Sequence, residues 1–262
     1  MKHLLIAAHP GHELLLWQWL RNERPQVVVL TNGAGSNGVP RLDLTIDNLE
    51  RAGASWVSQV VAPVPDAAIY QGLLDGDTGL FTQWIEALTA HVIAEGIECI
   101  VADEAEDYNP SHDLCRILAN QVAIQAKARG HSVLAYGYPT VGHPSLLTRL
   151  AAEEHVVVEL DVEAWRSKLD DMHRYARHFG GQLQRELDDF VAEFGAEAYS
   201  KECLFVARPT RYEQAETPSH KPFFERVGEE RVAAGTYKHV IRGAHLQVVA
   251  DRLRDHASLM RR

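Results

Sequence analysis

Short, continuous runs of apolar residues alternate with longer amphipathic stretches through the first half of the chain. The runs are rich in β-branched residues, as in strands buried on both faces of a parallel sheet. The stretches between them have apolar positions at helical spacing. This alternation predicts an α/β fold with a doubly wound, mostly parallel sheet. We expect strands at 4–8, 27–31, 57–61, 99–102 and 132–136, and helices at 14–24, 40–52, 80–94 and 112–129.

The alternation weakens after Gly142. Asp161 is a suitable N-cap for a helix that runs to 179. Because the sequence has no internal repeat and no clear linker, we expect a single domain, 1–262, with helical additions at its C-terminal end. In the second half we expect strands at 156–160 and 204–207 and helices at 183–194, 224–233 and 240–256, with loops at 63–79 and 209–222.

Composition limits the classes of protein and partner. The chain has 262 residues and is 46% hydrophobic, so it can bury a large core. Its net charge of −10 argues against nucleic-acid and anionic-membrane partners, and no apolar run is long enough to span a membrane. The apolar run before His9 is too short for a signal peptide. The three widely spaced cysteines indicate reduced, buried thiols, so we expect a cytoplasmic protein.

Two histidines follow the first expected strand, and a third follows the fourth. His9 and His12 lie in the turn after 4–8, and His112 begins the helix at 112–129. Ligands of open α/β sheets bind at the carboxyl ends of the strands, where the first and fourth strands are commonly neighbours. Three imidazoles with an open fourth position are typical of catalytic zinc, although iron, nickel and copper also accept them. Alternatively, the histidines are unrelated polar turn residues.

The residues around these histidines resemble two motifs of one family. The opening, HLLIAAHPGHE, resembles that of the LmbE-like (PIG-L) family of zinc-dependent N-deacetylases, in which a strand precedes Ala-His-Pro-Asp-Asp-Glu. Asn109-Pro110-Ser111-His112 stands in the place of the second motif, His-Pro-Asp-His. Weaker similarities continue in order as far as GAEAYSKECLF at 195–205, so the resemblance covers most of the chain. It implies a Rossmann-like α/β fold and zinc-dependent hydrolysis of an amide.

The resemblance also implies which residues bind the metal. Carried over position by position, the ligands are His9, His12 and His112, with His12 in place of the family's aspartate. Two departures concern the chemistry. Gly11 stands where the family has its general base, and Asn109 stands where it has a histidine. Glycine cannot accept a proton, so the family's mechanism cannot operate here unchanged.

Another carboxylate would have to act as the base. We expect Glu106 in this role because it lies just before the second motif, with Glu13, Asp107 and Asp113 as alternatives. Asn109 can donate a hydrogen bond to an oxyanion but cannot act as an acid. For each carboxylate taken singly, a solvated acidic side chain or a charge at a helix N-terminus is the simpler interpretation.

Three further residues are expected to contact a substrate. The glycine-rich segment at 33–38 matches G-x-G-x-x-G, but it follows the second strand and the helix begins only at Pro40. We therefore expect a flexible lip over the metal site there instead of a dinucleotide site, with Arg41 reaching a polar substrate. A solvated helix residue is the alternative for Arg41. Tyr108 adjoins the second motif, and His143 follows the fifth strand at the same end of the sheet.

These observations lead to one main hypothesis and two alternatives. The main hypothesis is a Zn²⁺-dependent hydrolase that removes the N-acyl group of an amino sugar or related small molecule. The first alternative is a relative that binds a metal and a sugar-like ligand or a partner without hydrolysis, because the family's residues are absent at Gly11 and Asn109. The second is a metal-dependent enzyme of changed reaction type. A homo-oligomer is possible in each case.

Overall fold

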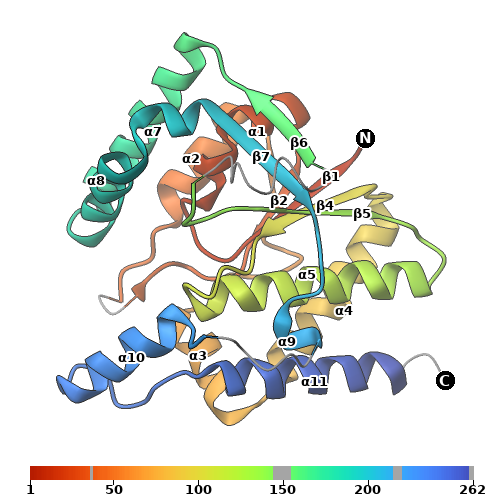
Figure 1. Cartoon of the computed structure of the whole chain (residues 1–262). Coiled ribbons are helices and arrows are strands. Elements are labelled where there is room, and N and C mark those ends of the chain that lie inside the picture. The colour runs from red at the N-terminus through yellow and green to blue at the C-terminus, as the bar shows by residue number, and fades with distance from the viewer. Residues whose placement is uncertain (36–37, 144–154, 215–219, 260–262) are drawn as a thin grey trace.

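The fold is built on a seven-stranded, mostly parallel sheet (Figure 1). The computed structural model describes residues 1–35, 38–143, 155–214 and 220–259. The strand order is β3-β2-β1-β4-β5-β7-β6, in which β1 to β5 are parallel and β7 is antiparallel to both β5 and β6. The mostly parallel α/β sheet expected from the sequence is confirmed. The strands are β1 His3–Ala7, β2 Gln26–Val29, β3 Ser55–Trp56, β4 Cys99–Asp103, β5 Leu134–Tyr138, β6 His155–Glu159 and β7 Lys201–Val206.

Helices cover both faces of the sheet. α4 and α5 lie on one face, with α3 and α11 packed outside them, while α1, α2, α7 and α8 lie on the other side (Figure 1). The helices are η1 His12–Leu16, α1 Trp17–Glu23, α2 Leu42–Ala52, α3 Asp66–Asp75, α4 Gly79–Glu95, α5 Pro110–Ala128, α7 Val162–Phe179, α8 Gln182–Phe194, η3 Ala196–Ser200, α9 Arg211–Gln214, α10 Phe223–Ala233 and α11 Gly243–Leu259.

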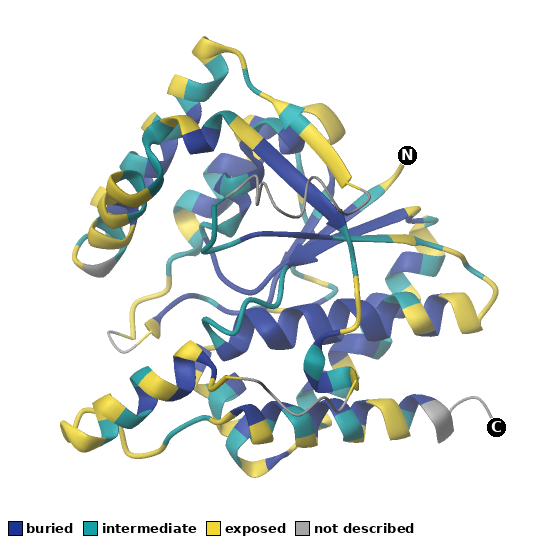
Figure 2. Cartoon of the chain, viewed as in Figure 1, coloured by how far each residue is buried: buried dark blue, intermediate teal, exposed yellow. Residues whose placement is uncertain are grey.

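The central strands β1 and β4 are buried on both faces (Figure 2). Successive side chains of a strand point to opposite faces. Leu4 and Ile6 accordingly pack in the cluster with α3, α4, α5 and α11, while Leu5 and Ala7 pack in the cluster with α1 and α2. Burying a Leu or Ile side chain contributes about 1.5–3 kcal/mol. This packing holds the carboxyl ends of β1 and β4 side by side.

The region between β2 and α4 differs from the expectation. β3 is only two residues long, and the expected strand at 57–61 is wrong because these residues form a turn. The expected loop at 63–79 contains the helix α3. Pro65 precedes its first residue, and Gly76 ends it with a φ of 65°, in the left-handed region where glycine is favoured. Pro65 and Gly76 are therefore helix boundaries.

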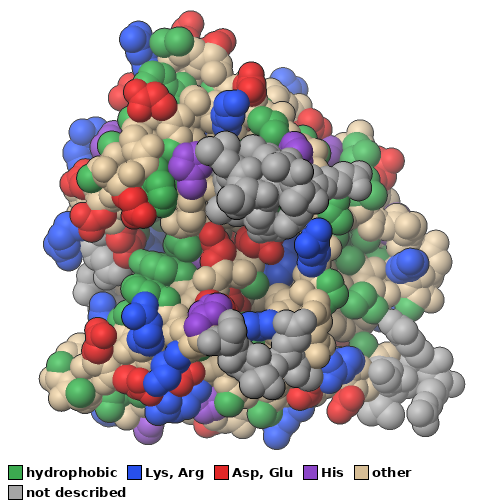
Figure 3. Space-filling view, viewed as in Figure 1, with side chains coloured by type: hydrophobic (Ala, Val, Ile, Leu, Met, Phe, Trp, Pro, Cys, Tyr) green, Lys and Arg blue, Asp and Glu red, His purple; other side chains and the backbone are tan. Residues whose placement is uncertain are grey.

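The second half follows the expected order more closely. Asp161 caps α7 by accepting a hydrogen bond from the N–H of Ala164 at 2.8 Å. The expected loop at 209–222 contains the short helix α9, and its residues 215–219 lie outside the described part of the chain, as do 36–37 of the expected lip. The cysteines are free and buried, as expected. Among the described residues, no helix combines the length and apolar character that crossing a membrane requires. Acidic and basic side chains are interspersed on the face shown in Figure 3.

Candidate metal centre

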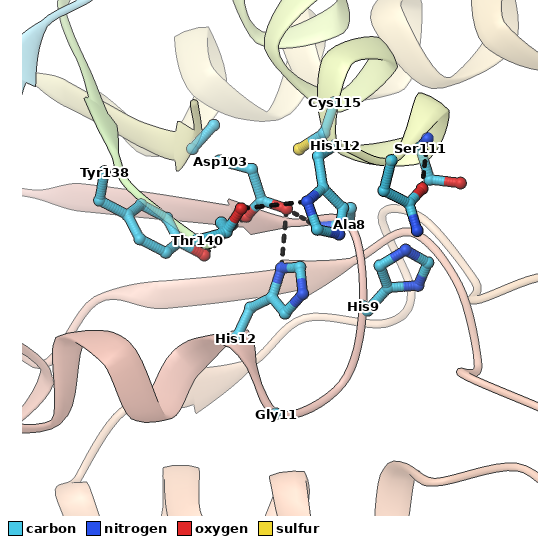
Figure 4. Close-up of polar contacts among 12 residues, drawn as sticks. Ala8, His9, Gly11, His12, Asp103, Ser111, His112, Cys115, Tyr138 and Thr140 are labelled. Atoms are coloured by element: carbon cyan, nitrogen blue, oxygen red, sulfur yellow. Dashed lines mark hydrogen bonds and ion pairs between the residues drawn. The ribbon is translucent and has the colours of Figure 1, made fainter. Parts of the chain in front are cut away.

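Three histidine side chains meet at the carboxyl edge of the sheet (Figure 4). Because β1 and β4 are parallel neighbours, the turn that carries His9 and His12 lies beside the start of α5, which carries His112. The ring centroids are 5.3 Å apart for His9 and His12, 5.1 Å for His9 and His112, and 4.6 Å for His12 and His112. Residues far apart in the sequence thus form one cluster of imidazoles.

The ring of His9 is held at its Nδ1 atom. This atom lies 2.9 Å from Oγ1 of Thr31 and 3.0 Å from Oδ1 of Asp66, while the buried Nε2 atom has no hydrogen-bond partner. Burial lowers the pKa of His9. Burial also acts to raise the pKa of Asp66, but the hydrogen bond and charge of His9 outweigh it and lower the pKa to about 2. The Nε2 atom of His9 is the only nitrogen of this ring left for a ligand.

The ring of His12 is held in the same way by a buried carboxylate. Nδ1 of His12 lies 2.8 Å from Oδ2 of Asp103, the last residue of β4. Asp103 also accepts hydrogen bonds from the N–H of Ala8 at 3.1 Å and the hydroxyl of Tyr138 at 2.6 Å. Burial of Asp103 would raise its pKa, but the charge of His12 outweighs this and lowers it. The carboxylate therefore orients His12 and is itself fixed by three donors.

The third ring meets a hydroxyl group. Nδ1 of His112 lies 3.0 Å from Oγ1 of Thr140, in the loop after β5. Burial is the main cause that lowers the pKa of His112, followed by the charges of His12 and His9. In Figure 4, Thr140 and Asp103 lie to the left of the His112 ring and His9 lies to its right. All three imidazoles thus have an oxygen partner at Nδ1.

This donor set fits a divalent transition metal. Metal-binding histidines almost always donate their second ring N–H to a carboxylate, backbone carbonyl or water, which fixes the ring and leaves the other nitrogen for the ion. The buried, unpartnered Nε2 atom of His9 is the group that a metal would satisfy. In the described residues, potential ligand atoms of His12, Asp103 and His112 lie within 4.8 Å of one another. Asp103 is therefore a further candidate ligand, and His9 lies outside this tighter group.

Gly11, at the position of the family's base, has no space for a side chain. Its φ of 97° lies in the left-handed region, and a Cβ atom there would lie 2.7 Å from Cε1 of Tyr175. The N–H of Gly11 donates to Oε2 of Glu13 at 2.7 Å. Glu13 is fully buried, and burial raises its pKa. In this structure Glu13 holds the backbone of the turn.

Solved structures share this architecture. No protein-family model and no curated protein matches the sequence. A triple mutant of a deacetylase of the teicoplanin biosynthetic pathway matches with a TM-score of 0.53 and 15% identity over 79% of this chain and 97% of that one. Dbv21, a deacetylase of an antimicrobial pseudoaglycone, matches with a TM-score of 0.51 and 15% identity over 80% of this chain and 99% of that one. The chain has the fold of these deacetylases. This agreement supports, at the level of the fold, the resemblance to LmbE-like proteins inferred from the sequence.

Within this deacetylase fold, Glu106 anchors the loop after β5. Its Oε2 atom accepts hydrogen bonds from the N–H and hydroxyl of Thr140, both at 2.7 Å, and from the N–H of Val141 at 3.1 Å, while Oε1 accepts from the N–H of Gly142 at 3.1 Å. The side-chain oxygen of Asn109 caps α5 through the N–H of Ser111 at 2.8 Å. That Glu106 is the base and that Asn109 binds an oxyanion stay predictions.

Asp107 and Asp113, two of the alternative candidates for the base, are also engaged in hydrogen bonds. Oδ1 of Asp113 accepts hydrogen bonds from the N–H groups of Glu106 and Asp107 at 3.0 and 3.2 Å. The hydroxyl of Tyr212 lies 2.8 Å from Oδ1 of Asp107 and 3.3 Å from Oδ2 of Asp113. Burial, and then the charge of Asp107, raise the pKa of Asp113. These side chains join the C-terminal segment to α5.

Each of the three residues expected to contact a substrate has a partner within the protein. Nε of Arg41 donates to the carbonyl of Gly33 at 2.5 Å, and so links Gly33 to the start of α2. Tyr108 stacks on Phe223 with a centroid distance of 4.7 Å and an interplanar angle of 5°. The ring of His143 lies edge-on to Phe194 at 5.4 Å. Their roles toward a substrate stay predictions.

Sequence reasoning missed the residues that orient the histidines. Asp66 begins a helix in a segment expected to be a loop, Asp103 lies just past the expected strand at 99–102, and Thr31 and Thr140 have no role in the sequence analysis. One signal was available for Asp103. It is a carboxylate at the end of a fully apolar run, in the strand next to the one that precedes His9.

Proposed function

We propose that the chain is a metal-dependent hydrolase that cleaves an amide C–N bond, with the N-acetyl group of an amino sugar or related small molecule as its substrate. The observation that carries the proposal is the cluster of three imidazoles, each with an oxygen partner at Nδ1. The fold shared with deacetylases, and the sequence motifs around the cluster, support amide hydrolysis as the reaction.

In this proposal His9, His12 and His112 hold the ion, and zinc is the metal that the resemblance implies. A bound divalent metal would polarise the amide carbonyl and lower the pKa of bound water to about 7. The NH₂ group of Asn109 donates to the carbonyl oxygen as charge develops on it, while the oxygen of the same side chain stays on the cap of α5. Arg41, at the start of α2 beside the lip, contacts polar groups of the substrate.

Tyr108 and His143 complete the proposed substrate contacts. Tyr108 adjoins Asn109, and its ring is held in place by stacking on Phe223. His143 follows β5, in the loop that Glu106 anchors. Both side chains therefore belong to segments that lead directly to the metal centre.

The identity of the general base is the part of the proposal that the hydrogen bonds in the structure constrain most. To act as the base, Glu106 would have to give up hydrogen bonds that it accepts from the loop after β5 and accept one from water instead. Positioned general bases contribute about 10²–10⁴-fold to rate. Glu106→Gln at saturating zinc tests the prediction, because an amide cannot accept a proton.

The function is tested with metal analysis and a substrate panel. Purified protein should contain, or take up, close to one equivalent of zinc, and should release acetate from a member of a panel of N-acetylated amino sugars. A chelator should abolish release and added zinc should restore it. His12→Ala should lose the metal and remain folded by circular dichroism. Wild-type protein that stays metal-free with added zinc contradicts the proposal.

One observation favours a second candidate function, metal and ligand binding without hydrolysis. Tyr175 fills the space beside Gly11 that the side chain of the family's base would need. Zinc-loaded protein that binds N-acetylated sugars in calorimetry, but releases no acetate across the panel, would favour this candidate. Chelator-sensitive turnover would exclude it, and conversion of a panel member to another product would indicate a changed reaction type.

A further inference from the structure

A directional chain of hydrogen bonds lies behind His112. Its Nδ1 atom is 3.0 Å from Oγ1 of Thr140, and the same hydroxyl is 2.7 Å from Oε2 of Glu106. A threonine hydroxyl has one proton to donate. Hydrogen bonds to carboxylates are shorter and stronger than those between neutral groups, so the proton points to Glu106. The oxygen of Thr140 is then an acceptor, and Nδ1 of His112 must be the donor.

This direction sets the tautomer of the ring. A neutral imidazole carries its proton on one nitrogen only. With the proton of His112 on Nδ1, the lone pair is on Nε2, the nitrogen a metal would use. If the hydroxyl of Thr140 instead donated to Nδ1, the proton would sit on Nε2 and block metal binding. The acceptor behind Thr140 therefore decides whether this ring can serve as a ligand.

Glu106 is itself held in a fixed orientation. The N–H groups of Thr140, Val141 and Gly142 all donate to its carboxylate. These contacts, together with the hydroxyl, occupy both oxygens. The segment 140–142 thus turns around the carboxylate and keeps the hydroxyl of Thr140 between Glu106 and His112.

We propose that Glu106 is a positioning residue, which acts through Thr140 to hold His112 in the tautomer that binds a divalent transition metal. The proposal rests on the metal site of the proposed function but not on hydrolysis. It gives each ring a carboxylate partner. Asp66 contacts His9 directly and Asp103 contacts His12 directly, whereas Glu106 reaches its histidine through a hydroxyl.

The first test measures zinc affinity by competition with a chromophoric chelator. Thr140→Val keeps the shape of the side chain and removes the hydroxyl, so zinc affinity should fall about 10–100-fold, as when such orienting partners are lost elsewhere. Thr140→Ser keeps the hydroxyl and should bind zinc like the wild type. Glu106→Gln keeps one acceptor oxygen, so its loss of affinity should be smaller than that of Thr140→Val.

The second test reads the tautomer in metal-free protein by ¹⁵N NMR of labelled histidine. The wild type and Thr140→Ser should show His112 protonated at Nδ1, and Thr140→Val should shift population to the form protonated at Nε2. Wild-type affinity and tautomer in Thr140→Val would overturn the proposal. So would Glu106→Gln with unchanged zinc affinity and hydrolysis lost at saturating zinc, because Glu106 would then be the base. Wild-type protein that binds no zinc contradicts the metal site itself.

Discussion

The ring of Tyr175 lies against Gly11, with its Cε1 atom 2.7 Å from the point where a Cβ atom of residue 11 would be. Tyr175 comes from the middle of α7, and Gly11 from the turn between β1 and η1. α7 is docked on this turn through an apolar cluster that also contains Leu14 and Trp17. The packing of α7 against this turn therefore leaves no room for a carboxylate side chain at position 11. Substituting aspartate for Gly11 alone would not restore the site of the family.

Restoring the family's residue should destabilise the protein. Gly11→Asp places a Cβ atom into the ring of Tyr175 and forces a non-glycine residue to a φ of 97°. Overpacking costs about 1–3 kcal/mol, and a left-handed backbone costs about 1–2 kcal/mol for a residue with a Cβ atom. We expect a lower melting temperature by scanning calorimetry. Gly11→Ala should lose nearly as much, since it adds the same atom without the carboxylate. Wild-type stability in Gly11→Ala would contradict this account.

Removing the charge behind His12 should weaken the metal site. In Asp103→Asn the side-chain oxygen would stay with the N–H of Ala8 and Nδ1 of His12, because the backbone N–H can only donate, and the NH₂ group would face the hydroxyl of Tyr138, which can also accept. The ring of His12 would keep an acceptor at Nδ1 but lose the neighbouring negative charge, which makes the imidazole a stronger metal ligand. Zinc affinity should fall about 10–100-fold in chelator competition.

Asp171→Asn is the matched control for this experiment. Asp171 accepts a hydrogen bond from Nε1 of Trp17 at 2.7 Å and pairs with Arg51 at 3.0 Å, so the variant alters a carboxylate that does not contact the histidines. It should lower stability and leave zinc affinity unchanged. Equal losses of zinc affinity in the two variants would mean that Asp103 has no specific role.

The strands predicted from the sequence agree with the structure where a continuous apolar run is buried on both faces of the sheet. Residues 4–7 and 99–102 are continuous apolar runs, and both are fully buried at the centre of the sheet. Because β1 and β4 are neighbours in the sheet, the segments that follow them bring His9 and His112 together. The helix α3 was missed because Pro65 and Gly76 mark the ends of a helix as readily as they mark a loop, and the contacts that select the helix are made with distant segments.

The residues that orient the histidines cannot be identified from the local sequence pattern. Asp66, Asp103 and Thr140 hold the histidines from segments that are far from them in sequence. A carboxylate at the end of a strand has the same local signature whether it is solvated or buried against a ring. Only the register of β1 against β4, and of β4 against β5, places Asp103 between Tyr138 and His12.

Raising the pH above 9 should destabilise the folded protein. Burial raises the pKa of Cys99 from 9.0 to about 12, and that of Cys203 from 9.0 to about 11. Above the ordinary thiol pKa the unfolded chain releases protons that the folded protein retains, so this contribution to stability is complete below pH 9 and is lost as the pH rises toward the folded values. At pH 10 each such thiol lowers the free energy of unfolding by about 1.4 kcal/mol.

Urea unfolding at pH 8.5 and pH 10 checks this expectation. Cys99→Val keeps a small apolar side chain on β4 and removes one thiol, so its loss of stability between the two pH values should be smaller than that of the wild type by about 1.2 kcal/mol. Folded protein at pH 8.5 should also react slowly with a thiol reagent and become reactive in denaturant. An identical pH dependence in Cys99→Val would rule out this thiol as a source.

A buried ion pair joins α7 to the sheet and so supports the packing of Tyr175 on Gly11. Nζ of Lys168, on α7, lies 2.9 Å from Oε1 of Glu202, on β7, and both side chains are almost completely buried. Glu202 also accepts hydrogen bonds from the backbone at the start of α1. Lys168→Met leaves this carboxylate buried without a cation, which costs about 3–5 kcal/mol.

The same pair gives a prediction that separates charge from packing. Lys168→Met with Glu202→Gln removes both charges, so the double variant should be more stable than the sum of the two single losses predicts, by at least ~1 kcal/mol in urea unfolding. Strictly additive losses would mean that the two charges are not coupled.

Because α7 carries both Lys168 and Tyr175, we also expect Gly11→Asp to cost less stability when it is added to Lys168→Met than when it is made in the wild type. A loosened α7 can move its aromatic ring away from residue 11, whereas an unchanged cost would show that Tyr175 is held there independently of the ion pair.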